Sequence, residues 1–171
     1  MLMNAAYLHL EAASSSELSR FNNALAALTL AALAIEALAN SIGDRIVQDW
    51  KDFETLSPLG KIRFLSERLA VQFDKQQEPW ATIHWLGVFR NRIAHAKPEE
   101  ILDVQSVTQE QVDRDLFSVP HSKLERDITL GNAVRAVDAV YEVKRRLCEK
   151  LTDEQAFGIA ADMWSDGTAP A

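Results

Sequence analysis

Apolar residues recur every three or four positions along the first third of this chain, and this spacing constrains the fold more than any other feature. They are Leu18, Phe21, Leu25, Leu28, Ala32, Ile35, Ala39, Ile42 and Ile46. Such spacing places them on one face of an α-helix. Ser14 and Glu17 stand at the spacing of a capping box and predict where this helix begins. A long apolar helix face of this kind must be buried against other elements of the protein.

Three further long helices are predicted downstream. The dipeptide Ser57-Pro58 predicts a helix start, with serine as the cap and proline as the first helical residue. Glu78-Pro79 predicts the next start, and that helix should end near His95 because Pro98 disfavours helical geometry just before it. The last long helix is predicted over roughly 129–151. Four main helices with short connections, plus short terminal helices, indicate an all-α helical bundle.

One long irregular segment interrupts this pattern. Residues 98–127 form a connection that directly follows His95, and long loops in compact domains are often functional. Within it, residues 101–108 contain enough β-branched side chains to predict a short extended piece. We expect residues 1–166 to form a single domain and residues 167–171 to form a disordered tail.

Composition limits the class of partner and the compartment. The net charge of −7 argues against holding nucleic acid by bulk electrostatics, so RNA would need a local basic pocket, completed by a second subunit. The single cysteine fits a reducing cytoplasm. No secretory signal is evident, and the most apolar run, 24–39, is too short and too weakly apolar for a membrane span. We therefore expect a cytoplasmic protein that does not contact a membrane.

The run Arg90-Asn91-Arg92-Ile93-Ala94-His95 carries the clearest chemical signal. Arginine suits phosphate recognition because its planar guanidinium donates several hydrogen bonds at once. Histidine is the side chain best placed to move protons near neutral pH. Together they indicate chemistry on a phosphodiester. His84 lies eleven residues before His95, roughly on the same helix face, as either a second catalytic imidazole or an ordinary core or surface histidine.

An arginine, a polar residue, three further residues and a histidine, placed at the end of a helix in an all-helical domain, resemble the HEPN superfamily. The matching residues are Arg90, Asn91 and His95. The long first helix, which carries Glu36 and Asn40 within an apolar face, is also similar to that family. The resemblance implies a helical bundle, and many such bundles are metal-independent ribonucleases that act as toxins or antiviral effectors. It also implies a homodimer in which two motifs form one cleft.

The resemblance further implies a mechanism. The ribose 2′-hydroxyl would attack the adjacent phosphorus and give a 2′,3′-cyclic phosphate and a 5′-hydroxyl. His95 would transfer a proton, Arg90 would stabilise the developing charge, and Asn91 would orient the imidazole or donate to the phosphate. Arg92 lies nearer His95 on a helical wheel and is expected as an auxiliary phosphate contact, with Glu36 and Asn40 also auxiliary. We expect RNA as substrate, an antitoxin as a possible protein partner in a defence or toxin–antitoxin system, and no metal or cofactor.

The same residues also fit a structural role. Asn91 and His95 could cap the helix that contains them, and Arg90 could pair with a buried Glu36. Glu36 and Asn40 could equally form a polar stripe on their helix. The alternative function is therefore a non-catalytic helical interaction module of the same fold, whose acidic surface binds a protein partner.

Overall fold

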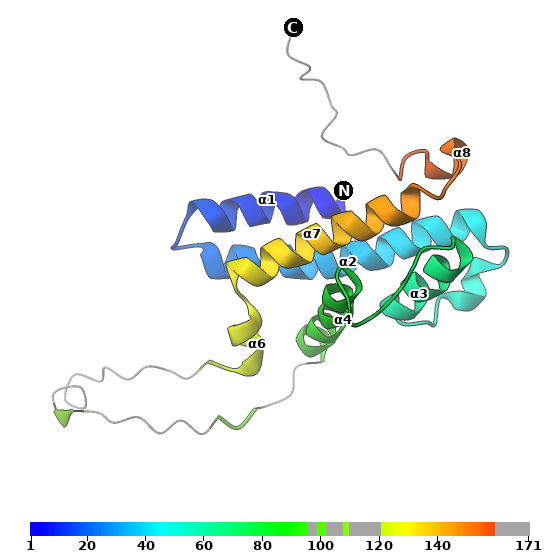
Figure 1. Cartoon of the computed structure of the whole chain (residues 1–171). Helices are drawn as coiled ribbons and strands as arrows, with labels where there is room; N and C mark the ends of the chain where they lie inside the picture. Colours follow the sequence, from blue (N-terminus) through cyan, green and yellow to red (C-terminus); the bar gives the residue numbers. More distant parts are fainter. Residues whose placement is uncertain (96–98, 102–107, 110–120, 160–171) are drawn as a thin grey trace, which may run out of the picture.

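The computed structural model describes residues 1–95, 99–101, 108–109 and 121–159, and these residues form helices joined by turns and short connections (Figure 1). The predicted all-α bundle is confirmed. The elements are α1 (Leu2–Ser15), α2 (Arg20–Ile46), the 3-10 helix η1 (Trp50–Phe53), α3 (Pro58–Arg68), α4 (Trp80–Ala94), α6 (Lys123–Asp127), α7 (Leu130–Cys148) and α8 (Asp153–Ala156). The extended piece predicted over 101–108 falls mostly outside the described residues, and the predicted tail 167–171 falls wholly outside them.

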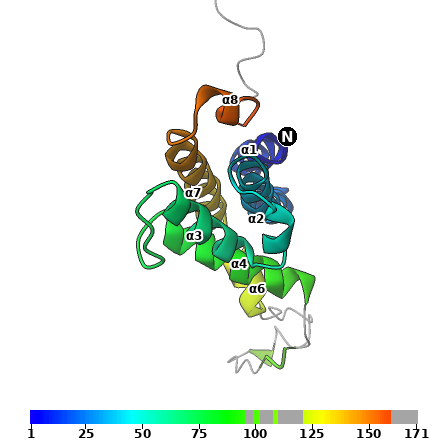
Figure 2. The ribbon, with the colours of Figure 1, turned by 90° about the vertical axis from the view of Figure 1, so that its right-hand side faces the viewer.

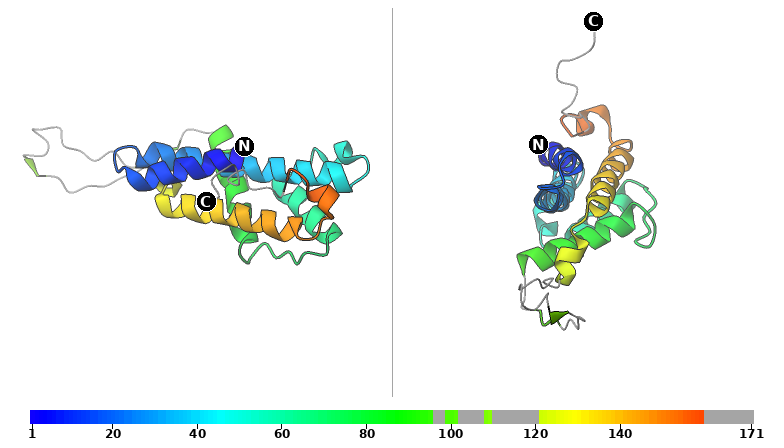
Figure 3. Two further views of the ribbon diagram at one scale, coloured as in Figure 1. Left: turned by 90° about the horizontal axis from the view of Figure 1, so that it is seen from above. Right: turned by 90° about the vertical axis from the view of Figure 1, so that its left-hand side faces the viewer.

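Helix α2 is the centre of the bundle. It packs against α1, α3, α4 and α7. Helices α1, α2 and α7 run lengthwise beside one another, whereas α4 crosses them (Figures 1 and 2). The view from above shows α7 alongside α1 and α2 (Figure 3). The buried face of α2 is rich in alanine, and small side chains allow the neighbouring helices to approach closely.

The predicted start of the first long helix is wrong. Helix α1 ends at Ser15 and α2 begins at Arg20, so the serines terminate one helix rather than start another. The hydroxyl of Ser14 donates to the carbonyl of Leu10 at 2.9 Å instead of accepting from a helix start. Leu18, expected in the apolar stripe, is 99% exposed. The reason is that the first fifteen residues bury an apolar face of their own against α2.

An aromatic cluster packs against the far end of α2. The buried indole of Trp50 stacks on Phe53 with ring centroids 5.7 Å apart, and Phe64 lies 4.7 Å from Phe53. Trp50 lies directly over Gly43, where an added Cβ would come within 2.3 Å of the indole. Glycine at this position is therefore required by the close approach of the ring.

The caps of α3 and α4 set the position of the motif. Ser57 caps α3 and accepts from the amide of Gly60 at 3.1 Å, as predicted. The carboxylate of Glu78 accepts from the hydroxyl of Thr82 at 2.9 Å and fixes the first turn of α4. Helix α4 ends at Ala94, so the motif occupies its last two turns, where α4 crosses α2 and contacts α6.

Candidate functional site

The guanidinium of Arg90 turns toward Asn91 and toward α2. It donates from Nη1 to Oδ1 of Asn91 at 3.2 Å, and its Nη2 lies 3.8 Å from Oε2 of Glu36. The Arg90 side chain remains 39% exposed. On a helical wheel Arg90 lies far round from His95, whereas Asn91 and His95, four residues apart, share one face. The hydrogen bond to Asn91 and the ion pair with Glu36 hold the Arg90 guanidinium between the Asn91 side chain and α2.

Glu36 holds a second cation besides Arg90. Its Oε1 lies 3.7 Å from Nζ of Lys61, whose side chain is only 2% exposed. The same Nζ donates to Oδ1 of Asn40 at 2.9 Å. Glu36 and Asn40, one turn apart on α2, thus both face the buried ammonium that α3 supplies.

Lys61 was missed by the sequence reasoning. Its position carried a signal, because it stands four residues before Leu65, which belongs to the buried stripe of α3. A residue at that spacing faces the same neighbour as the stripe.

The cluster has an excess of positive charge. Lys61 and Arg90 share the single carboxylate of Glu36, so one positive charge is left over where the chain as a whole carries −7. Lys61 is buried, and the partly exposed guanidinium of Arg90 therefore presents this excess to solvent. Arginine has five N–H donors, so it can bind an anion while it remains bonded to Asn91.

Arg92 is directed away from this cluster. Its Nη2 lies 2.6 Å from Oδ2 of Asp127 on α6. Its Nε is buried and has no hydrogen-bond partner within the described part of the chain. As an auxiliary phosphate contact, Arg92 would have to bind the substrate with N–H donors that its ion pair with Asp127 leaves unused.

His95 is exposed at the exit of α4. Its backbone leaves the helix with φ −128° and ψ 42°, while its amide still donates to the carbonyl of Asn91 at 3.0 Å. Within the described residues its imidazole makes no hydrogen bond, so the ring is accessible to a ligand from solvent. It therefore does not cap α4 with its side chain inside the described region.

A cavity of about 250 Å³ lies beside Arg90 and Asn91. Three elements meet around it: the middle of α2, the first turn of α3 and the exposed face of α4. Its lining residues are Ala32, Ile35, Ser57, Pro58, Leu59, His84, Gly87, Val88, Arg90 and Asn91. The walls are mainly apolar, and Arg90 and Asn91 contribute polar groups to the lining.

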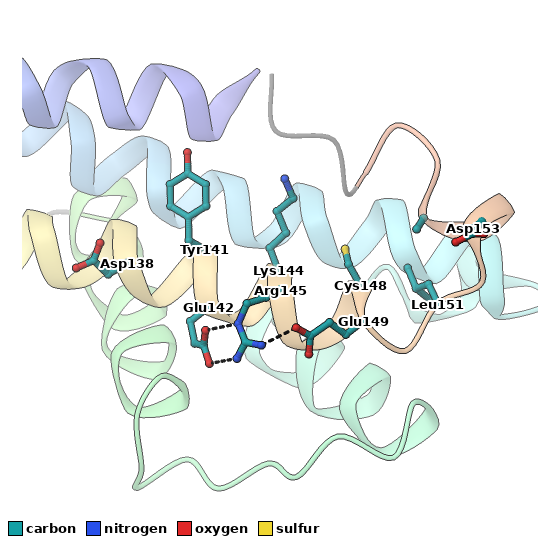
Figure 4. A pocket seen from close by; sticks show the side chains of 10 residues that line it. Asp138, Tyr141, Glu142, Lys144, Arg145, Cys148, Glu149, Leu151 and Asp153 are labelled. Carbon is teal, nitrogen blue, oxygen red and sulfur yellow. Dashed lines mark hydrogen bonds and ion pairs between the residues drawn. The ribbon is translucent and has the colours of Figure 1, made fainter. Parts of the chain in front are cut away.

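A second, wider concavity of about 770 Å³ lies between the end of α7 and α8 (Figure 4). Three of its charged residues pair with one another: Arg145 donates to Glu142 at 2.7 Å and to Glu149 at 2.6 Å. Hydrogen bonds from Arg145, and then from Arg146, lower the pKa of Glu142 from 4.5 to about 2. The carboxylates already occupy these arginines, and no residue of the motif lies there, so the cluster around Arg90 is the better candidate site.

Comparison of the chain with protein-family models, curated proteins and solved structures found no match. Within the described ranges, no group of three or more histidine, cysteine, aspartate or glutamate residues could hold a metal ion. The expectation that the run 24–39 is too short and too weakly apolar for a membrane span is wrong by length and composition, because the whole of α2 is long and apolar enough to cross a membrane. Core helices of soluble proteins share this property, and half of the most apolar stretch of α2 is buried in the bundle.

Proposed function

We propose that this chain is a HEPN-like, metal-independent endoribonuclease that works as a homodimer in the cytoplasm. The observation that carries the proposal is the hydrogen bond between Arg90 and Asn91. It holds the guanidinium beside Asn91, four residues before the exposed His95. Ribonuclease activity requires that this phosphate-binding group and this proton-transferring group reach the same substrate. A role as a defence or toxin–antitoxin effector, with an antitoxin as partner, follows from the family resemblance.

In the proposed reaction, the ribose 2′-oxygen forms a bond to phosphorus while the bond from phosphorus to the 5′-oxygen breaks. The 2′-hydroxyl loses a proton and the leaving 5′-oxygen gains one, so the reaction needs both a general base and a general acid. One motif supplies one imidazole, and a dimer would supply His95 twice. Arg90 would stabilise the charge on the non-bridging oxygens, held in place by Glu36 and Asn91.

A homodimer also answers the problem of charge. Each protomer presents one excess positive charge through the cluster of Lys61, Arg90 and Glu36. Two such clusters facing one cleft would attract a phosphate backbone that the rest of the acidic chain repels. Because contacts to phosphate would dominate such binding, the affinity for RNA should fall as the salt concentration rises.

A second candidate is a non-catalytic interaction module of the same fold. The observation that favours it is that Arg90 already has two protein partners, Glu36 on α2 and Asn91 on α4. In that case the guanidinium locks α4 onto α2 and has no role in chemistry. The two candidate functions differ in the role of His95, because an Arg90 that only joins α4 to α2 does not need an exposed imidazole nearby.

The test is RNA cleavage by the purified chain in the presence of a chelator. The wild type should cut RNA and leave 2′,3′-cyclic phosphate ends, and His95→Ala should be slower by roughly 10²–10⁴-fold. His9→Ala is the matched control, because His9 lies on α1 and bonds to Asn23 at 2.9 Å, outside the site. Equal residual cleavage by the wild type and His95→Ala would reject the ribonuclease and favour the interaction module.

A further inference from the structure

Gly87 is an unexpected residue for its position. It lies in the interior of α4, where glycine is the least favourable residue apart from proline. No packing explains it, because an added Cβ would meet nothing within 4 Å. This contrasts with Gly43, where the ring of Trp50 excludes any side chain. What Gly87 provides is open space in the wall of the 250 Å³ cavity.

The cavity combines mainly apolar walls with a few polar groups. Ile35, Pro58 and Val88 contribute apolar walls, and the exposed His84 adds an aromatic ring. Its volume is below the roughly 300–1,000 Å³ that drug-sized ligands occupy, which suits a single planar group. Unpaired RNA bases are typically recognised by stacking on aromatic side chains, histidine included, and by hydrogen bonds to their edges.

We propose that this cavity binds one unstacked nucleobase of RNA, whose neighbouring phosphate lies on Arg90. The inference rests on the proposed ribonuclease function and names its specificity pocket. Asn91 gives Oδ1 to Arg90 at 3.2 Å and keeps its amide donors for the edge of a base. Ser57 accepts from Gly60 at 3.1 Å and keeps its hydroxyl proton to donate.

The position of the charge favours a nucleotide over an uncharged ligand. The excess positive charge of the cluster reaches solvent through Arg90, which itself lines the cavity. A base in the cavity would therefore have its phosphate close to the guanidinium of Arg90. A hydrophobic side chain from a second copy of the protein would fill the cavity without using Arg90.

The test fills the cavity without disturbing the helix. Gly87→Leu places a side chain in the cavity and should favour α4, because leucine is a better helix former than glycine. Gly131→Leu on α7 is the matched control, since a Cβ at Gly131 also meets nothing within 4 Å and that residue lies outside the cavity. The probes are the four nucleoside 3′-monophosphates and, without a base, ribose 5-phosphate, titrated into the full chain by calorimetry.

The wild type should bind at least one nucleotide about tenfold or more tightly than ribose 5-phosphate. Gly87→Leu should remove this difference and leave ribose 5-phosphate binding unchanged, His84→Ala should reduce it, and Gly131→Leu should match the wild type. Equal affinity for nucleotides and ribose 5-phosphate would overturn the inference. So would unchanged nucleotide affinity in Gly87→Leu accompanied by a shift in oligomeric state, which would assign the cavity to a second copy.

Parallel cleavage assays separate this inference from the ribonuclease proposal. If the wild type binds nucleotides selectively but cuts no RNA, the base pocket stands and the ribonuclease proposal fails. If RNA is cut and Gly87→Leu keeps the base preference of the wild type at the cut site, the base pocket fails and the ribonuclease stands.

Discussion

Removing the charge of Glu36 should destabilise the protein, because this carboxylate balances a buried cation. In Glu36→Gln, Nζ of Lys61 keeps its bond to Asn40 at 2.9 Å but loses the negative charge 3.7 Å away. The Lys61 side chain is 2% exposed, so water cannot replace the lost partner without opening the contact between α2 and α3. The substitution keeps the size of the side chain and changes mainly its charge.

The magnitude follows from the distance and the burial. Two unit charges 3.7 Å apart attract by about 4.5 kcal/mol at an effective dielectric constant of about 20. Breaking a fully buried pair costs about 3–5 kcal/mol, but Glu36 is 30% exposed and its own desolvation is relieved by the substitution. We expect the free energy of unfolding to fall by about 1–3 kcal/mol. The double variant Glu36→Gln with Lys61→Met should lose less, because it leaves no buried charge without a partner.

Urea denaturation followed by circular dichroism measures these differences. The matched control is Glu67→Gln, which breaks an exposed pair with Arg63 at 2.9 Å and should cost no more than about 0.5 kcal/mol. If Glu36→Gln costs no more than Glu67→Gln, Lys61 does not depend on Glu36 and the cluster does not position Arg90 as described.

Three further substitutions test the packing and the surface charges. Gly43→Ala should destabilise the protein by about 1–3 kcal/mol, because the added Cβ would overlap the ring of Trp50. Gly87→Ala should stabilise the protein by up to about 1 kcal/mol, because alanine favours the helix and its Cβ meets nothing within 4 Å. Urea midpoints of the two variants that move in the same direction would contradict this. Glu142→Gln should cost about 0.5–1 kcal/mol at pH 7, since its pairs with Arg145 are partly exposed and screened. Its folded pKa of about 2 lies below the ordinary 4.5, so the wild-type advantage is present above pH 4.5 and is lost as pH falls toward 2; an advantage that persists at pH 2 would contradict the assignment.

Local sequence signals predicted the start of α3, both ends of α4 and the approximate span of α7, but failed between α1 and α2. The predicted role of Ser57 as a helix cap is confirmed. It could be predicted because its partner, the amide of Gly60, lies only three residues away in the same turn. The serines before Glu17 look the same whether a helix ends or begins there. The choice is made by tertiary packing, since Leu10 and its neighbours bury an apolar face against α2.

The candidate site was predicted in part. The pairing of Arg90 with Glu36 was expected as the structural alternative, and it is present at 3.8 Å. The reach of Arg90 toward Asn91 could not be predicted from a wheel, because it depends on side-chain torsions. Lys61 was missed because lysine is almost never buried unless it is paired, and its partners come from a different helix.

The most direct test of the proposed chemistry is cleavage of an RNA oligonucleotide in which one nucleotide, on the 5′ side of a bond that the wild type cuts, carries 2′-deoxyribose. The reaction is run with a chelator, and the fragments are identified by mass spectrometry. Because the 2′-oxygen is the proposed nucleophile, cleavage at that bond should disappear, while other bonds still give 2′,3′-cyclic phosphate and 5′-hydroxyl ends. Cleavage at the deoxy position, or fragments that end in 5′-phosphate, would contradict the mechanism assigned to Arg90, Asn91 and His95.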